Sequence, residues 1–251
     1  MTITASECNL ETIRPWRDEY RREMSCQIIH DSIHVRSGWT REFMLRIGDA
    51  PVGYGSLAVS GPWKEKPTLY EFHVLRQHRS RAFDLFEALR SASGAVAIET
   101  QSNDPQLTIM LHAYGRNVIS EAILFEDGIT TSLAPPPGCA LRRRVEEDSG
   151  RMFTHHAEPV GDWLIDADGA IAATGGILYH YNRPYGDIYM EVAEPFRRRG
   201  IGAYLVQELK RVCYEGGSVP AARTGTDNLP SRQTLQKAGF VPCGHILVGS
   251  L

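Results

Sequence analysis

The sequence predicts a mixed α/β fold, in which two tandem modules carry strands and helices in the same order. A proline-rich segment at residues 135–138 divides the 251-residue chain, because consecutive prolines favour an extended spacer that continues neither a helix nor a strand. On each side of it, a hairpin pattern precedes a further strand, a basic loop and an amphipathic helix. We therefore expect one module over residues 1–134 and a second over residues 139–251.

The elements of the first module follow from alternating apolar residues, turn residues and one helical stripe. A turn at residues 48–51 separates the two strands of the expected hairpin. The elements expected here are strands at 43–47, 52–59 and 69–75, a helix with Phe83, Phe86 and Leu89 on one face, and a strand at 95–99.

The second module repeats this order after the proline-rich segment. Its hairpin turns at residues 166–169, which contain Asp168 and Gly169, two residue types that favour tight turns. The elements expected here are strands at 163–166, 170–181 and 188–193, a helix from about residue 203 with Tyr204, Leu205, Leu209 and Val212 on one face, and a strand at 218–222.

The basic loop of the second module, residues 197–202, has the sequence Arg-Arg-Arg-Gly-Ile-Gly. A loop between a strand and a helix directs several backbone N–H groups and the positive end of the helix dipole to one point, where a phosphate or pyrophosphate binds. Gly200 and Gly202 allow the backbone to approach such a ligand closely. The alternative is a solvated basic turn before a surface helix. Ala82 and Asp84 replace the two glycines in the first module, so we expect only the second module to hold an anion.

Composition limits the classes of partner. The net charge of −3 and the pI near 6.3 give no general attraction for nucleic acid or an anionic membrane. No apolar segment is long enough for a membrane helix, and the N-terminus has no leader pattern. Because the cysteines are odd in count and scattered along the chain, they indicate neither a disulfide framework nor a metal site. We expect a cytoplasmic monomer or homodimer without bound metal, with its five cysteines at Cys8, Cys26, Cys139, Cys213 and Cys243.

A second pattern follows the basic loop at residues 228–240, with the sequence Asn-Leu-Pro-Ser-Arg-Gln-Thr-Leu-Gln-Lys-Ala-Gly-Phe. The Arg-x-x-Gly-x-Gly pattern of the basic loop, followed by this second pattern, resembles the signature of the GCN5-related N-acetyltransferase (GNAT) superfamily. The N-terminal half resembles a degenerate copy of the same fold. The resemblance implies two tandem acyl-CoA N-acyltransferase-like modules and acetyl-CoA as cosubstrate. It also implies a bulged strand whose main chain holds the acetyl carbonyl. The cofactor-binding residues that it implies are Met190, Val192, Arg197, Arg198, Arg199, Gly200, Ile201, Gly202, Asn228 and Ser231.

Helix capping is an alternative role for Asn228 and Ser231, because short polar side chains at a strand-to-helix junction often cap the helix. Gly239, near the end of the same pattern, is expected in the left-handed conformation at the helix C-terminus rather than in the site.

The candidate catalytic residues are Asp187, Tyr189 and Glu191, which strand alternation places on one face. A carboxylate beside the acetyl site can act as the general base, and pairing with arginine or exposure at a strand end is the alternative. The tyrosine that many GNAT enzymes use to protonate the thiolate is replaced by Leu235. Only twelve residues follow Gly239, so we expect the sheet edge to be completed by the other half, by the N-terminal arm or by a second chain.

These features together favour an N-acetyltransferase that transfers acetyl from acetyl-CoA to a primary amine by direct attack. The acceptor is a small-molecule amine or a peptide amine. Leu235 and the lost glycines of the first module favour the alternative, a non-catalytic acyl-CoA-binding sensor or interaction module.

Overall fold

The computed structural model describes residues 1–251 as two compact units. Unit 1 comprises Met1–Ala122 and Gly244–Leu251, and unit 2 comprises Ile123–Cys243. The division therefore differs from the expected one, because the proline-rich segment 135–138 lies inside unit 2. The last eight residues of the chain also belong to unit 1, because their strand pairs with a strand of the first half.

Unit 1 contains the expected hairpin, the next strand, the helix and the strand after it. The sequence did not reveal the strand and helix that precede them or the helix that follows them. Its elements are β1 (Ile3–Cys8), α1 (Leu10–Met24), η1 (Asp31–Val35), β2 (Thr40–Ile47), β3 (Ala50–Ala58), η2 (Gly61–Trp63), β4 (Thr68–Val74), η3 (Arg76–Arg81), α2 (Ala82–Ser93), β5 (Ala97–Gln101) and α3 (Pro105–Tyr114).

Unit 2 confirms the predicted order of hairpin, strand, helix, strand and helix. Two strands, β6 (Arg116–Asp127) and β12 (Phe240–Ser250), contain the residues at which the chain passes between units. The other elements are β7 (Cys139–Arg143), η4 (Glu146–Arg151), β8 (Trp163–Ala167), β9 (Ala170–Leu178), β10 (Tyr185–Val192), η5 (Glu194–Phe196), α4 (Ile201–Glu215), β11 (Val219–Gly225) and α5 (Leu229–Lys237).

Both units use the same mixture of strand directions. In unit 1, β2, β3 and β4 are antiparallel neighbours, and β4 runs parallel to β5. In unit 2, β8, β9 and β10 are antiparallel, and β10 runs parallel to β11. The strand beside β11 in unit 2 is β6, which precedes the proline-rich segment. The strand that the short C-terminal tail cannot supply therefore comes from the N-terminal side of the expected boundary.

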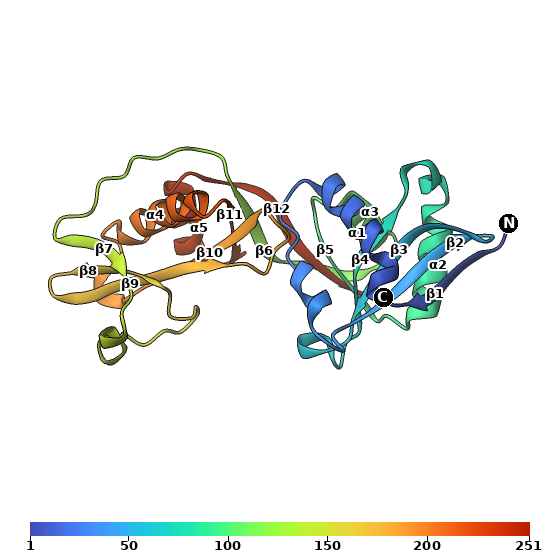
Figure 1. Ribbon diagram of the computed structural model, residues 1–251, viewed down its shortest axis with the longest axis horizontal. Helices are drawn as coiled ribbons and strands as arrows, with labels where there is room; N and C mark the ends of the chain where they lie inside the picture. Colours follow the sequence, from blue (N-terminus) through green and yellow to red (C-terminus); the bar gives the residue numbers. More distant parts are fainter. The chain divides into compact units, whose positions relative to one another are not determined.

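The core of unit 2 lies between α4 and one face of β9 and β10 (Figure 1). Ile188 is buried in this core, and Met190 and Val192 pack against it, so the alternation predicted for β10 is confirmed. Asp168 and Gly169 turn the β8–β9 hairpin with φ values of 52° and 79°, the paired positive values of a type I′ turn.

Equivalent contacts follow β4 in unit 1 and β10 in unit 2, which are the strands that come after the two hairpins. The Nε of Arg79 donates to the carbonyl oxygen of Val74 at 3.0 Å, and the Nε of Arg197 donates to that of Val192 at 3.1 Å. The two basic loops therefore leave their strands in the same way.

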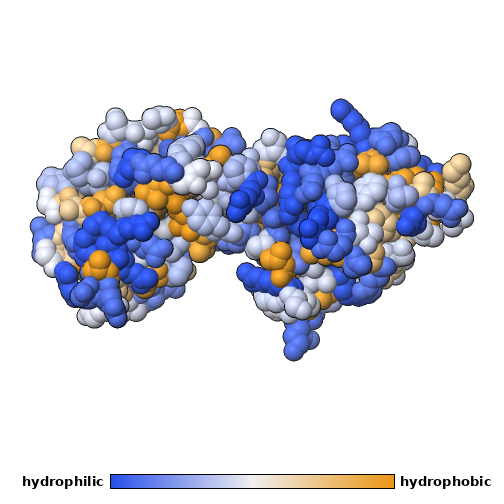
Figure 2. Space-filling model, viewed as in Figure 1, coloured by the Kyte–Doolittle hydropathy of each residue, from blue (hydrophilic) through white to orange (hydrophobic).

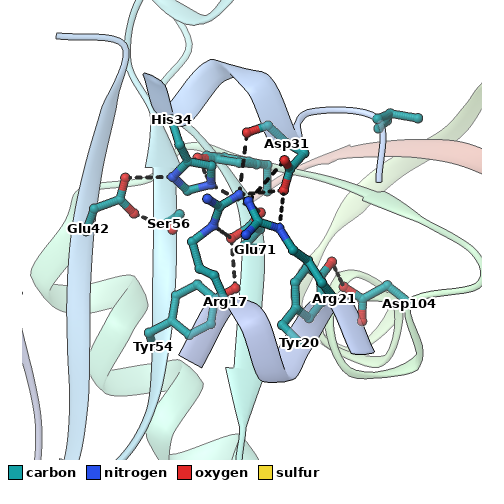
Figure 3. Close-up of polar contacts among 12 residues, drawn as sticks. Arg17, Tyr20, Arg21, Asp31, His34, Glu42, Tyr54, Ser56, Glu71 and Asp104 are labelled. Atoms are coloured by element: carbon teal, nitrogen blue, oxygen red, sulfur yellow. Dashed lines mark hydrogen bonds and ion pairs between the residues drawn. The ribbon is translucent and has the colours of Figure 1, made fainter. Parts of the chain in front are cut away.

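A buried polar network distinguishes unit 1 (Figure 3). Arg17, on α1, donates from Nε and Nη2 to the two carboxylate oxygens of Glu71 at 3.1 and 3.2 Å. The His34 ring lies 3.0 Å from Glu42 and 3.1 Å from Glu71. Burial acts against the charged forms, yet Arg17 and His34 lower the pKa of Glu71. Glu71 and Glu42 in turn raise the pKa of His34. These groups are paired with one another, which gives the network a structural role.

The surface is of mixed character. Hydrophilic residues predominate on the face shown in Figure 2, with hydrophobic residues interspersed among them. No helix of the chain has both the length and the apolar character required to cross a membrane.

Candidate active site

The candidate site of unit 2 lies where β10 and β11 separate. These parallel strands are paired at Tyr185–Val219, Gly186–Pro220 and Asp187–Ala221. Beyond Asp187 the ladder of β10 continues only on the β9 side, as far as Val192. The edge of β10 that faces β11 is therefore open over the second half of the strand.

The main chain of Met190 and Val192 points to this open edge. The N–H of Ala193 donates to the carbonyl oxygen of Ala172 at 2.9 Å, on the β9 side. Because N–H groups alternate between the two edges of a strand, those of Met190 and Val192 are directed toward β11. This is the arrangement that a carbonyl or amide ligand between the two strands needs.

The bulge that the family resemblance implied for this strand is absent. The register between β9 and β10 is unbroken from Asp187 to Val192. A register shift occurs instead between β3 and β4, where Glu71 and Leu69 face consecutive residues and leave Tyr70 extra. The separation of β10 from β11, rather than a bulge, exposes the main chain at the site.

Unit 1 shows how such an opening is closed by a side chain. The N–H of Val74 donates to the Oε1 of Gln106 at 3.0 Å. Gln106 is the second residue after the N-cap of α3, and the second residue after the N-cap of α5 is Pro230. Proline has no polar side chain, so the equivalent N–H of Val192 has no such partner.

The basic loop before α4 has the geometry of an anion site. Arg198 and Gly200 have φ values of 62° and 81°, so left-handed residues alternate along the loop, an arrangement that turns successive N–H groups toward one side. No side chain caps α4, which leaves the N–H groups of its first turn, from Ile201 onward, available to a ligand.

The three arginines of the loop differ in their partners. Arg197 is held by the carbonyl oxygen of Val192. Arg199 lies 3.3 Å from the exposed Asp168, and its guanidinium stacks on Phe196 at 5.2 Å. Arg198 has no ion-pair partner, and its side chain is exposed. Arg198 is therefore the loop arginine that is most available to an anion.

Two further contacts define the space beside the loop. The Nζ of Lys237, at the end of α5, lies 3.8 Å from the position that a Cβ on Gly200 would take. A Cβ on Gly202 would lie 3.2–3.3 Å from side-chain atoms of Thr234, Met190 and Val192. Gly202 thus permits a close approach of α4 to both β10 and α5, and Lys237 adds a positive charge that the sequence patterns did not indicate.

The second sequence pattern forms α5. The Oδ1 of Asn228 accepts from the N–H of Ser231 at 3.1 Å, so Asn228 caps the helix in this structure. Leu235 is buried with 4% exposure and packs in the core, where it offers no proton. Gly239 follows the helix with a φ of 93°, which confirms its predicted left-handed conformation.

A polar cluster surrounds Asp187 on the face of β10 that is opposite α4. The carboxylate is buried and lies 3.2 Å from the Nε2 of His180 and 3.6 Å from the Nε of Arg223. The side chain of Tyr181 is buried beside Asp187. Burial and the charge of Asp187 hold the pKa of Tyr181 well above its usual value.

Glu191 is differently engaged. Its carboxylate accepts the backbone N–H groups of His156, Ala157 and Glu158 at 3.1–3.2 Å. Burial acts to raise the pKa of Glu191, but the three N–H donors outweigh it and lower the pKa. A carboxylate stabilised in this way is a weak base.

Tyr189 lies between these acids. A Cβ on Gly176 would lie only 2.7 Å from its hydroxyl oxygen, so the missing side chain on β9 makes room for the phenol. Burial, followed by the charges of Asp162 and Glu158, raises the pKa of Tyr189. The hydroxyl therefore remains protonated and able to donate near neutral pH.

The structure brings the three predicted catalytic residues to one face, with the loop residues and the edge of β10 nearby in the same unit. It adds Glu158, Arg223 and Lys237, which sequence reasoning missed. None of them belongs to a short motif, and Glu158 lies in an irregular segment whose path no periodicity predicts.

Comparison with protein-family models gives a match for this region. Residues 129–240 match the model of the acetyltransferase (GNAT) family. The matched region falls within unit 2 and includes the loop, β10 and α5. Comparison with curated proteins gives no match.

Solved structures share the fold over the whole chain. An acetyltransferase of the GNAT family from Colwellia psychrerythraea aligns with a TM-score of 0.72 at 12% identity and covers 100% of both chains. A GCN5-related N-acetyltransferase from Sphaerobacter thermophilus gives a TM-score of 0.61 at 13% identity over 99% of this chain and 95% of that one. A tandem GNAT protein from the clavulanic acid biosynthesis pathway gives a TM-score of 0.60 at 13% identity, over 100% of this chain and 98% of that one. At these identities, the similarity establishes a tandem GNAT fold.

Proposed function

We propose that the protein is an N-acyltransferase that takes acetyl from acetyl-CoA and transfers it to a primary amine. The observation that carries this proposal is the open edge of β10 beside the uncapped N-terminus of α4. An extended acyl-thioester arm can bond to the Met190 and Val192 main chain there, while the pyrophosphate lies at residues 197–202.

Each part of the loop would have a separate role in binding. The N–H groups around Ile201 and Gly202 would donate to phosphate oxygens, and Arg198 and Lys237 would add positive charge. Arg197 would act through the shape of the loop, because its Nε is already bonded to Val192. Asn228 would keep α5 in place as its cap, with Ser231 on the exposed first turn.

The acceptor amine would approach the face of β10 that carries Asp187. An ammonium group is favoured there by the buried carboxylate, which His180 and Arg223 keep in place. Attack requires a neutral amine, so a carboxylate on this face must take one proton. The hydroxyl of Tyr189 is the proposed donor to the departing thiolate, in the absence of a tyrosine at position 235.

Binding and turnover test the proposal separately. Calorimetry should give one equivalent of bound acetyl-CoA per chain, because Gln106 fills the opening of unit 1 and Asp84 opposes an anion there. Release of the free thiol of CoA should be measured with acetyl-CoA and a panel of primary amines, including amino acids, diamines and short peptides. Two equivalents of acetyl-CoA, or no binding at all, would contradict the donor site.

A non-catalytic acyl-CoA-binding module is the second candidate, favoured by the burial of Leu235 where many GNAT enzymes place an acid. It predicts tight binding of acetyl-CoA with no amine-dependent release of CoA. Turnover of any amine in the panel would exclude it.

A further inference from the structure

The segment 153–161 lies against the acceptor side of β9 and β10 and is fixed at three points. The Nε2 of His155 lies 2.7 Å from the Oγ1 of Thr174, and the N–H of Gly161 donates to the same oxygen at 3.4 Å. Glu191 accepts the N–H groups of residues 156–158 between these points. The segment is therefore anchored to the sheet by side chains of β9 and β10.

Glu158 is the acidic residue that this segment presents to the site. Its own N–H is bound by Glu191 at 3.1 Å, while its carboxylate makes no hydrogen bond or ion pair and is partly buried. Burial and the charge of Asp187, with a smaller effect of Glu191, raise its pKa against the opposing charge of Arg223. Tyr189 on β10 is a further neighbour, and its pKa responds to the charge of Glu158.

The three carboxylates of this face therefore differ in availability. Asp187 is engaged by His180 and Arg223, and Glu191 by three amides. Only Glu158 has a carboxylate with neither a hydrogen bond nor an ion pair, whereas both contacts of Asp187 end on its Oδ2.

We infer that Glu158 is the group that deprotonates the acceptor amine, and that Glu191 is a positioning residue that holds Glu158 through the backbone of residues 156–158. This inference rests on the proposed function. Glu158 takes one proton from the ammonium group and later releases it to solvent. The amine lone pair forms the C–N bond, the C–S bond breaks with its electrons on sulfur, and the second proton lost by nitrogen ends on the thiolate.

Kinetics of two single variants and their combination test the assignment. Loss of a general base typically lowers the rate by roughly 10²–10⁴-fold, so Glu158→Gln should lower kcat by that factor and leave acetyl-CoA affinity unchanged. Glu191→Gln should lower kcat less, because Glu158 is still present. The double variant should be no slower than Glu158→Gln, since Glu191 acts only through Glu158. Glu147→Gln, at an exposed position of η4, is the matched control.

Titration of Glu158 gives a second readout that needs no turnover. In protein labelled with ¹³C at glutamate carboxyls, the Glu158 signal is identified by its loss in Glu158→Gln. It should titrate above the ordinary glutamate range and move toward that range in Glu191→Gln.

Full activity of Glu158→Gln, additive losses in the double variant, or an ordinary titration of Glu158 would each overturn the inference. If the wild-type protein turns over no amine, the proposed function fails, and the ¹³C titration still decides whether Glu191 controls Glu158.

Discussion

Gly202 offers the sharpest test of the donor site, because a side chain there enters the space shared by α4, α5 and β10. A Cβ at this position would stand 3.2–3.3 Å from three side-chain atoms, a contact that small shifts can accommodate. Gly202→Asp would place a carboxylate beside the proposed pyrophosphate. Gly202→Asn has nearly the same shape without the charge, and Gly202→Ala measures the cost of the Cβ alone.

The expected magnitude follows from charge separation. Two unit charges about 5 Å apart interact by roughly 3 kcal/mol at an effective dielectric constant of about 20. Screening at a partly exposed loop reduces this, so we expect at least about 1.4 kcal/mol between the Asp and Asn variants. This difference corresponds to a tenfold weaker affinity for acetyl-CoA.

Calorimetric titration with acetyl-CoA at low and high salt measures this difference. The gap between Gly202→Asp and Gly202→Asn should narrow as salt rises, because the repulsion is screened. Thermal unfolding of each variant controls for lost structure. Equal affinities of the Asp and Asn variants, in folded proteins, would refute a pyrophosphate at this helix end.

Three further predictions concern stability. Burial raises the pKa of Asp104 to about 6, so its contribution to stability is present below the unfolded pKa near 4 and is lost as pH rises through 6. Urea unfolding should show a loss of up to about 3 kcal/mol between pH 4 and 7 from this group, and Asp104→Asn should remove it. Glu71→Gln removes the more deeply buried of the two carboxylates that pair with Arg17, the other being Asp31, and should cost up to about 3–5 kcal/mol, whereas replacing both Glu71 and Arg17 by apolar residues should cost less; equal losses would contradict this. A fragment of residues 139–251 should be insoluble, because it lacks β6. A fragment of residues 116–251 retains β6, and a larger fraction of it should stay in the supernatant when the two fragments are compared by sedimentation.

The order of helices and strands from β2 to β5 and from β8 to α5 was predictable from the sequence, whereas β1, α1, α3 and the unit boundary were not. Hairpin turns such as Asp168–Gly169 and the stripe on α4 are local signals that short-range physics determines. The boundary depends on which strands pair across long sequence distances. Buried Lys210 illustrates this: it lies 2.5 Å from Asp127 and donates to the carbonyl of Ile129 at 3.0 Å, both N-terminal to the proline-rich segment.

Helix α1 escaped sequence analysis for a related reason. Its buried face carries Arg17 together with Ile13 and Tyr20, so a charged residue interrupts the apolar stripe, and Pro15 lies inside the helix. Arg17 can be buried because two carboxylates pair with it, that of Asp31 and that of Glu71, which is more than fifty residues away. A pattern search for apolar periodicity cannot anticipate a core position that a charge fills.

The candidate site also has parts that the sequence predicts and parts that it does not. The conformation of the loop at residues 197–202 was predictable, because glycine and a helix start encode it locally. The surroundings of the acids were not, because the availability of a carboxylate depends on what its oxygens already accept. Glu191 and Glu158 are both acidic in the sequence, and only the path of the intervening segment shows that one binds three amides and the other none.

The comparison of the two units sharpens the argument for a single donor site. Both contain a parallel strand pair that separates, since β4 pairs with β5 only at Thr68 and Leu69 and β10 pairs with β11 only as far as Asp187. A separated pair of strands is therefore not sufficient to mark a ligand site. The difference lies in the free main-chain donor: Gln106 satisfies the N–H of Val74, and Pro230 cannot do the same for Val192. An unpaired backbone donor costs free energy when it is removed from water, and an acyl-CoA amide or carbonyl on β10 would recover that cost.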